Sequence, residues 1–155
     1  MNPRINNKIA AFGVFVQSLL ATLGSLYYSN FGDIVVNIQS GEWFPVGAGL
    51  EPCQLCWWAR ILMYPIVGLS YIALVKRQWS YFVYIRIAAF LGILLEMYHY
   101  AMQKFDFANP FGCTLSNPCD ALKVDYFDFI TIPFLCLVAF VVVFILSLLV
   151  KIDKQ

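Results

Sequence analysis

Charged residues are scarce in this chain of 155 residues: lysine, arginine, aspartate and glutamate together form 12% of it, and histidine occurs once. The net charge is +1, and no basic run stands anywhere in the sequence. Because nucleic-acid binding leaves a footprint of clustered lysine and arginine, no nucleic-acid partner is expected. Internal repeats and low-complexity tracts are also missing, which excludes repeat arrays. The chain is predicted to form a single domain over 1–155.

Apolar side chains are abundant instead, at 61% of the sequence, with 17% aromatic residues and a mean hydropathy of +0.74. A soluble domain of this size has too little interior to bury them, so lipid must be part of the solvent. A membrane-spanning helix needs roughly 20 apolar residues. Such segments lie at about 9–28, 57–75, 81–103 and 129–150. The sequence therefore predicts an all-α integral membrane protein, a bundle of four transmembrane helices with outer loops at about 29–56 and 104–128.

Lysine and arginine set the orientation of the predicted helices, because they accumulate on the cytoplasmic side of membranes. They precede the first segment, fill the link between the second and third, and follow the fourth, at Arg4, Lys8, Lys76, Arg77, Lys151 and Lys154. The two other connections carry only two lysines, Lys104 and Lys123, among an excess of acidic residues. Both termini are therefore predicted to be cytoplasmic, and both outer loops to face the oxidising side.

Residues 51–60 read Glu-Pro-Cys-Gln-Leu-Cys-Trp-Trp-Ala-Arg and place Cys53 and Cys56 in C-x-x-C spacing just before the second apolar segment. Two intervening residues let the sulfurs reach each other, and a helix starting after the second cysteine would stabilise the Cys56 thiolate. Arg60, one turn further on, could stabilise the same thiolate. These features favour redox activity over two alternatives, a disulfide that only ties a loop and one half of a zinc site.

Cys113 and Cys119 lie together in the second outer loop, and two interpretations of them stay open. A single disulfide that clips a loop is common in extracellular segments. Alternatively, thiolate exchange could pass electrons from a soluble dithiol through this pair to the pair at the helix start. A zinc site formed by both pairs is disfavoured by the five-residue spacing, so no metal is expected. Cys136, within the fourth segment, is interpreted as a small packing residue.

Three polar residues are predicted to converge beneath the C-x-x-C pair. Arg60 is costly to hold near lipid without a polar partner, which favours a functional role over simple snorkelling to the surface. Glu96 and His99 are spaced i and i+3 and share one face of the third helix, at an outer depth similar to that of Arg60. Together they would form a proton-handling pocket, in which Arg60 could also hydrogen-bond a carbonyl oxygen that becomes anionic on reduction. The alternative is a structural pair of Glu96 with Arg60 or Arg86.

Two prolines fall inside the predicted helices, Pro65 in the second and Pro133 in the fourth. Each would remove a backbone hydrogen bond and could kink its helix. Simple packing within the bundle is the alternative for both.

Residues 51–65, Glu-Pro-Cys-Gln-Leu-Cys-Trp-Trp-Ala-Arg-Ile-Leu-Met-Tyr-Pro, resemble the signature of the disulfide bond formation protein B (DsbB) family. The short spacing of Cys113 and Cys119 is more similar to the BdbC branch of Gram-positive bacteria. The likeness extends over nearly the whole chain: four helices, Pro-Cys-x-x-Cys-x3-Arg before the second, His99 near the end of the third and Pro133 in the fourth.

This resemblance implies a thiol:quinone oxidoreductase of the bacterial plasma membrane that supports disulfide bond formation in exported proteins. Its partner would be an extracytoplasmic thioredoxin-like thiol oxidase (DsbA/BdbD-like), and its electron acceptor a quinone, either menaquinone or ubiquinone. Cys113 and Cys119 would face the partner, with Cys113 the expected site of a mixed disulfide, while Cys53 and Cys56 would reduce the quinone. Arg60 and the histidine of the third helix match quinone-associated residues of the family.

Three other classes stay in view. A metal-binding module would contain zinc when purified and would lose its fold with a chelator. A vitamin K epoxide reductase-like enzyme performs related quinone chemistry, but that family carries its active C-x-x-C on a later helix. A non-enzymatic membrane protein with two structural disulfides would resist mild reductant and form no mixed disulfide with another protein.

Overall fold

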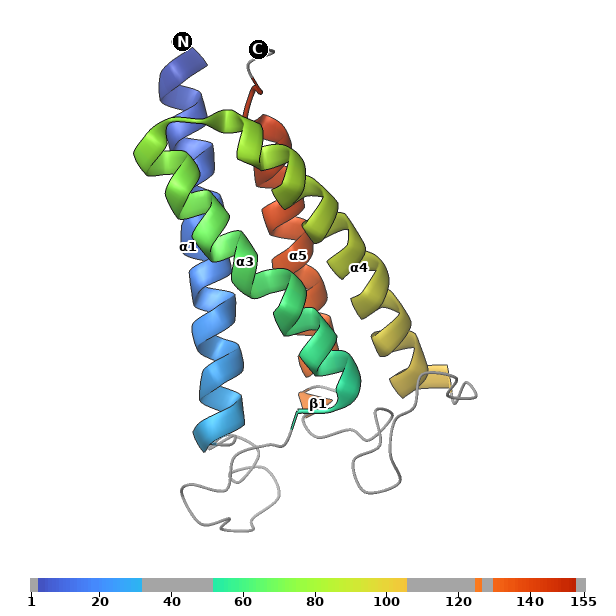
Figure 1. Ribbon diagram of the computed structural model, residues 1–155. Helices are drawn as coiled ribbons and strands as arrows, with labels where there is room; N and C mark the ends of the chain where they lie inside the picture. Colours follow the sequence, from blue (N-terminus) through green and yellow to red (C-terminus); the bar gives the residue numbers. More distant parts are fainter. Residues whose placement is uncertain (1–2, 32–51, 106–124, 127–129, 153–155) are drawn as a thin grey trace.

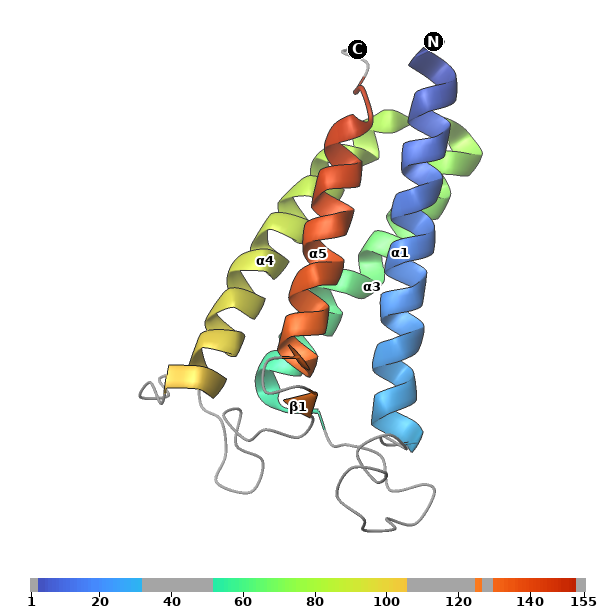
Figure 2. The ribbon, with the colours of Figure 1, turned by 180° about the vertical axis from the view of Figure 1, so that it is seen from behind.

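Four long helices dominate the computed structural model, which describes residues 3–31, 52–105, 125–126 and 130–152. They are α1 (Pro3–Phe31), α3 (Gln54–Lys76), α4 (Phe82–Phe105) and α5 (Ile132–Leu149), with a short 3-10 helix η1 (Trp79–Tyr81) ahead of α4. The helices run side by side in one bundle (Figures 1 and 2). The start of α1 and the end of α5 lie at one end of it, and α3 begins at the other end (Figure 1). The two ends are called here the terminal end and the cysteine end.

All four helices are long and apolar enough to cross a membrane, over Asn7–Asn30, Gln54–Lys76, Trp79–Lys104 and Ile132–Leu149. Only 22% to 28% of each span is buried inside the protein. Large apolar side chains therefore cover the outside of the bundle, as at Leu20, Ile87 and Leu94. Such a surface suits a hydrocarbon environment, and it confirms the expectation of an all-α bundle of four membrane-spanning helices. Which end faces the cytoplasm stays a prediction.

The helices pack in a ring in which α1 contacts α3 and α5, while α4 contacts α3 and α5. Buried apolar side chains from all four helices fill the centre, and α5 contributes the large ring of Phe140. That ring lies against Gly92 of α4, where an added Cβ would come within 2.4 Å of it. The absence of a side chain at Gly92 thus allows α4 and α5 to approach closely.

Polar side chains fasten the terminal end of the bundle. Arg86 of α4 donates from Nη2 to the carbonyl oxygens of Ser147 at 2.9 Å and Val150 at 2.7 Å. Both carbonyls lie at the end of α5, where regular helical donors run out, and that of Ser147 also accepts the backbone N–H of Val150 at 3.2 Å. The side chain of Asn7 accepts a hydrogen bond from the backbone N–H of Lys151 and donates one to its carbonyl, each at 2.9 Å. Arg86 therefore links α4 to the end of α5.

Helix starts differ from the predictions in two informative places. α3 begins at Gln54, three residues before the expected start, so Cys53 is its N-cap and Cys56 lies in its first turn. α5 begins at Ile132 with Thr131 as N-cap. Pro133 thus occupies the first turn, where its missing N–H costs nothing, and the prediction that it lies inside the helix and kinks it is wrong. Pro65 does lie inside α3, as predicted.

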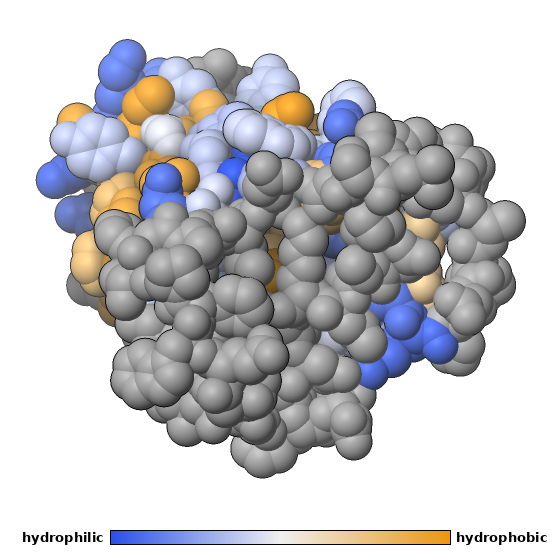
Figure 3. Space-filling model, turned by 90° about the horizontal axis from the view of Figure 1, so that it is seen from below, coloured by the Kyte–Doolittle hydropathy of each residue, from blue (hydrophilic) through white to orange (hydrophobic). Residues whose placement is uncertain are grey.

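A short antiparallel pairing precedes α5, where the sequence predicted loop for the first strand and the start of the fourth helix for the second. Strand β1 (Asp125–Tyr126) pairs with β2 (Ile130–Thr131), in the register Asp125 to Thr131 and Tyr126 to Ile130. It places the chain entering α5 at the cysteine end (Figure 1). Viewed from this end, hydrophilic and hydrophobic residues both reach the surface among those described (Figure 3).

Candidate functional site

The first turn of α3 holds the cysteine pair. Cys53 has extended backbone angles, φ −68° and ψ 170°, as an N-cap residue does, and its Sγ accepts the backbone N–H of Cys56 at 3.3 Å. The two sulfurs lie 2.8 Å apart. Because a disulfide bond is about 2.05 Å long, small side-chain movements suffice to make or break the bond. Cys53 is buried, with 4% of its surface exposed, while Cys56 is half-buried.

A histidine and a glutamate from α4 stand behind Cys53. The Nε2 atom of His99 lies 3.6 Å from Cys53 Sγ, and its Nδ1 lies 3.5 Å from Glu96 Oε2. Both residues are almost wholly buried, each 1% exposed. The row of thiol, imidazole and carboxylate has the order of a nucleophile, a base and a group that orients the base. A buried charge needs a partner, so the two α4 side chains can accept and hold a proton between them.

Electrostatics favour a thiolate at Cys53. Its pKa lies well below the usual range because the thiol of Cys56 donates a hydrogen bond to it, and His99 adds a second hydrogen bond and a favourable charge; these outweigh the effect of burial. The sequence had predicted that the helix start favours the thiolate of Cys56. In the structure, the backbone N–H of Cys56 in the first turn donates to the sulfur of Cys53 instead. The reason is that Cys53 is the N-cap residue, whose side chain accepts the N–H of the residue three positions later.

Arg60 is held in place by α1. Its Nε donates to Ser25 Oγ at 2.9 Å and its Nη2 to the Ser25 carbonyl oxygen at 3.1 Å. The guanidinium also lies over the ring of Trp57, 5.3 Å from its centroid. Within the described residues, Arg60 and Arg86 thus bond to oxygens other than those of Glu96, and the expected alternative of a Glu96–arginine pair does not occur there.

Sequence reasoning missed Ser25. Its only signal is a small hydroxyl residue near the outer end of the first apolar segment, where an intramembrane arginine needs an acceptor. Gln17 of α1 also lines the same cavity as Arg60.

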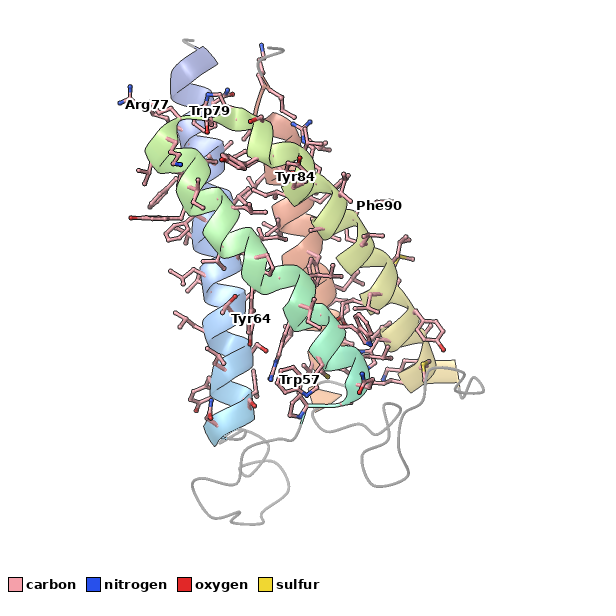
Figure 4. All side chains as sticks on the ribbon, viewed as in Figure 1. Trp57, Tyr64, Arg77, Trp79, Tyr84 and Phe90 are labelled. Carbon is pink, nitrogen blue, oxygen red and sulfur yellow. The ribbon has the colours of Figure 1, made fainter. Side chains whose placement is uncertain are left out.

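A cavity of about 340 Å³ lies beside the cysteine pair and is lined by residues of α1, α3, α4 and α5. Its walls are mostly apolar, and its polar lining residues come from all four helices: Gln17, Ser25, Tyr28, Ser29, Cys56, Arg60, Tyr64, Glu96, His99 and Cys136. It lies in the half of the bundle marked by Trp57 and Tyr64, away from Arg77 and Trp79 (Figure 4). An apolar cavity of this size with a few convergent polar groups is typical of a small-molecule site.

The structure therefore brings five predicted site residues to one place: Cys53, Cys56, Arg60, Glu96 and His99. The second predicted pair, at positions 113 and 119, lies outside the described residues. Cys136, expected to serve only for packing, also contributes to the cavity wall.

The arrangement pairs a reversible dithiol with an internal base and an adjoining apolar cavity. Of the two clustered cysteines, Cys56 is the one that lines the cavity, whereas Cys53 packs with Leu55 and Met102 on the side toward α4. Such a site can exchange electrons with a ligand through one sulfur while a proton leaves through the other.

Comparison with known proteins agrees with this chemistry. The family profile described as disulfide bond formation protein DsbB matches residues 31–150. The chain is 37% identical to a "Probable disulfide formation protein" of Oceanobacillus iheyensis over 139 residues, covering 88% of this chain and 85% of the relative. It is 34% identical to "Probable disulfide formation protein C" of Halalkalibacterium halodurans over 155 residues, covering 99% and 100%.

A third relative, "Disulfide bond formation protein C" of Bacillus subtilis, is 33% identical over 151 residues, covering 97% of this chain and 98% of its own. No solved structure matches the chain significantly.

Proposed function

This chain belongs to the disulfide bond formation protein DsbB family, and from that premise we propose that it is a protein-dithiol:quinone oxidoreductase. Its membership of this family and its four apolar helices support a role in disulfide formation at a membrane. The observation that carries the proposal is that one sulfur of a closely spaced dithiol lines an apolar cavity which Arg60 and His99 also line.

The cavity has the chemistry that a quinone requires. A quinone offers a flat apolar ring and two carbonyl oxygens, so it needs apolar walls and a few hydrogen-bond donors. The apolar lining, the guanidinium of Arg60 and the imidazole of His99 meet those requirements. When bound, the quinone would be the oxidant that takes two electrons and two protons as the Cys53–Cys56 dithiol becomes a disulfide.

Residues of the chain would have separate roles around the bound quinone. Cys56, which lines the cavity, is the sulfur next to the bound group. His99 would accept the thiol proton of Cys53 through Nε2, and the carboxylate of Glu96, 3.5 Å from Nδ1, would offset the charge of the protonated imidazole. Arg60, fixed by Ser25, donates hydrogen bonds to an oxygen on which negative charge develops.

The loop pair would connect this centre to a protein substrate. We propose that a thiolate of an extracytoplasmic thioredoxin-like partner attacks the Cys113–Cys119 disulfide, with Cys113 forming the mixed disulfide. The second partner thiol then releases the oxidised partner and leaves the loop pair reduced. A loop thiolate next attacks the Cys53–Cys56 disulfide, so two electrons move inward and the loop disulfide forms again.

The location follows from the same proposal. Both pairs would face the extracytoplasmic side of a bacterial plasma membrane, with both termini in the cytoplasm. The concentration of lysine and arginine near the terminal end supports this orientation.

The test is quinone-dependent oxidation of a purified thioredoxin-like dithiol by the chain in lipid nanodiscs. Cys56→Ser is expected to abolish turnover, whereas Met97→Ala, on the lipid-facing side of α4 with 55% exposure, should retain it. Full turnover by Cys56→Ser would show that the electron path is wrong. A protein with only structural disulfides would give no turnover and, in Cys119→Ala, no trapped mixed disulfide.

A further inference from the structure

Three potential metal ligands converge at the start of α3. The sulfurs of Cys53 and Cys56 and a ring nitrogen of His99 all lie within 4.8 Å of one another. Two of the three residues are buried and the third is half-buried. Thiolate and imidazole are the ligands that zinc prefers, whereas magnesium and calcium prefer oxygen. The set is therefore selective for a thiophilic cation.

One of the three distances between ligand atoms already matches a tetrahedral zinc centre. Bonds of about 2.3 Å to sulfur and about 2.0–2.1 Å to nitrogen imply roughly 3.6 Å between a sulfur and a nitrogen ligand, and roughly 3.8 Å between two sulfurs. Cys53 Sγ and His99 Nε2 already lie 3.6 Å apart. The two sulfurs, at 2.8 Å, would have to separate by about 1 Å. Cys56 borders the cavity and has room for that movement.

The surroundings of the imidazole are also those of a metal ligand. A histidine that binds a metal through one nitrogen usually donates its other N–H to a carboxylate, which fixes the ring. Here Glu96 Oε2 lies 3.5 Å from His99 Nδ1 on the side away from Cys53. The carboxylate would lie behind the ligand, where it would also offset part of the positive charge of the cation.

We propose that the reduced form of this site binds one zinc ion through Cys53, Cys56 and His99, with Glu96 as the supporting carboxylate. The fourth ligand position would face the cavity, where water or an anion completes the coordination. Oxidation of the two cysteines to a disulfide removes two of the three ligands, so only the dithiol form binds. Zinc would thereby hold the site reduced and block electron transfer until the ion is removed.

This proposal differs from a structural zinc module built from both cysteine pairs. It requires neither Cys113 nor Cys119, and the apolar core gives the bundle a source of stability that does not depend on the ion. Binding can therefore be measured in a Cys113→Ala/Cys119→Ala chain, which isolates the site.

The experiment titrates Zn²⁺ into that full-length variant in nanodiscs by calorimetry, once reduced and once with Cys53–Cys56 oxidised. Co²⁺ serves as a second probe, because thiolate-to-cobalt charge transfer and the d–d bands report two sulfur ligands in tetrahedral geometry. We expect one equivalent to bind the reduced form and none to bind the disulfide form. Glu96→Gln should weaken binding by about 10- to 100-fold, the usual effect of losing such a supporting group.

His99→Ala should weaken binding further and remove the tetrahedral cobalt spectrum, while Met97→Ala should bind like the parent. Helical circular dichroism checks that each variant is folded. Equal binding by reduced and oxidised chains, or unchanged affinity in both His99→Ala and Glu96→Gln, would overturn the proposal. Neither quinone nor partner protein is present in this experiment, so its failure is distinct from a failure of the proposed oxidoreductase function.

Discussion

Replacing Ser25 by alanine should impair the use of quinone without harming the bundle. The change removes the 2.9 Å hydrogen bond from Arg60 Nε to Ser25 Oγ but leaves the 3.1 Å bond from Nη2 to the Ser25 carbonyl oxygen. A hydrogen bond to a charged group contributes about 1.5–3 kcal/mol. Because 1.4 kcal/mol corresponds to a factor of ten, complete loss of Arg60 orientation would lower kcat/KM for quinone by roughly 10- to 100-fold. With one bond retained, the expected loss is near the lower limit, about tenfold.

The assay follows quinol formation at varied concentrations of a short-chain quinone, with the partner dithiol in excess. Ser25→Ala should raise KM or lower kcat/KM for quinone, while thiol exchange between the partner and the oxidised chain keeps its rate. Ser18→Ala is the matched control, since this serine lies on the same helix and bonds within it to the carbonyl oxygen of Phe15. Equal quinone kinetics for the parent and Ser25→Ala would refute the assigned role of Ser25 in holding Arg60.

Three further changes test other parts of the structure. Arg60→Lys should raise KM for quinone at least about tenfold, because a lysine cannot reproduce the planar fork of donors. Arg77→Lys, at the other end of α3, should leave KM unchanged, and equal effects of the two changes would contradict the role of Arg60 in binding quinone. Gly92→Ala should lower the free energy of unfolding by about 1–3 kcal/mol, because the added methyl group overpacks the contact with Phe140. Gly68→Ala, with open space around position 68, should leave that free energy unchanged or raise it slightly. Glu96→Gln should slow quinone reduction and shift its pH profile, because the proton would no longer be shared; an unchanged profile would remove the carboxylate from the mechanism.

Much of the fold is predictable because long apolar segments leave few alternatives in a membrane. The four helices and the position of Pro65 were found in this way. The start of α3 was missed by three residues because its cap is Cys53, whereas the familiar capping signals are serine, threonine, aspartate and asparagine. The start of α5 at Ile132 has such a signal in Thr131, and the length of the apolar run obscured it.

The sequence predicts which residues form the candidate site better than it predicts which of them contact one another. Helical spacing placed Glu96 and His99 on one face, and depth placed Arg60 near them. Which sulfur His99 approaches depends on how α4 packs against α3. The hydrogen-bond partner of Arg60 depends on how α1 packs against α3. Sequence periodicity describes one helix at a time, so it does not predict how two helices pack against each other. The preference for a thiolate at Cys53, and the contribution of Ser25, therefore emerged only from the packed bundle.

The central claim is that the C-x-x-C pair passes its electrons directly to a quinone, and a single-turnover measurement tests it. The Cys113→Ala/Cys119→Ala chain is reduced, placed in anaerobic nanodiscs and mixed with one equivalent of a short-chain quinone. Quinol is followed by absorbance and the Cys53–Cys56 disulfide by mass spectrometry. We predict one quinol for each disulfide formed, at matching rates, and none when Cys56 is serine. Quinol formation that persists without Cys56, or a fully reduced pair that leaves the quinone unchanged, would contradict it.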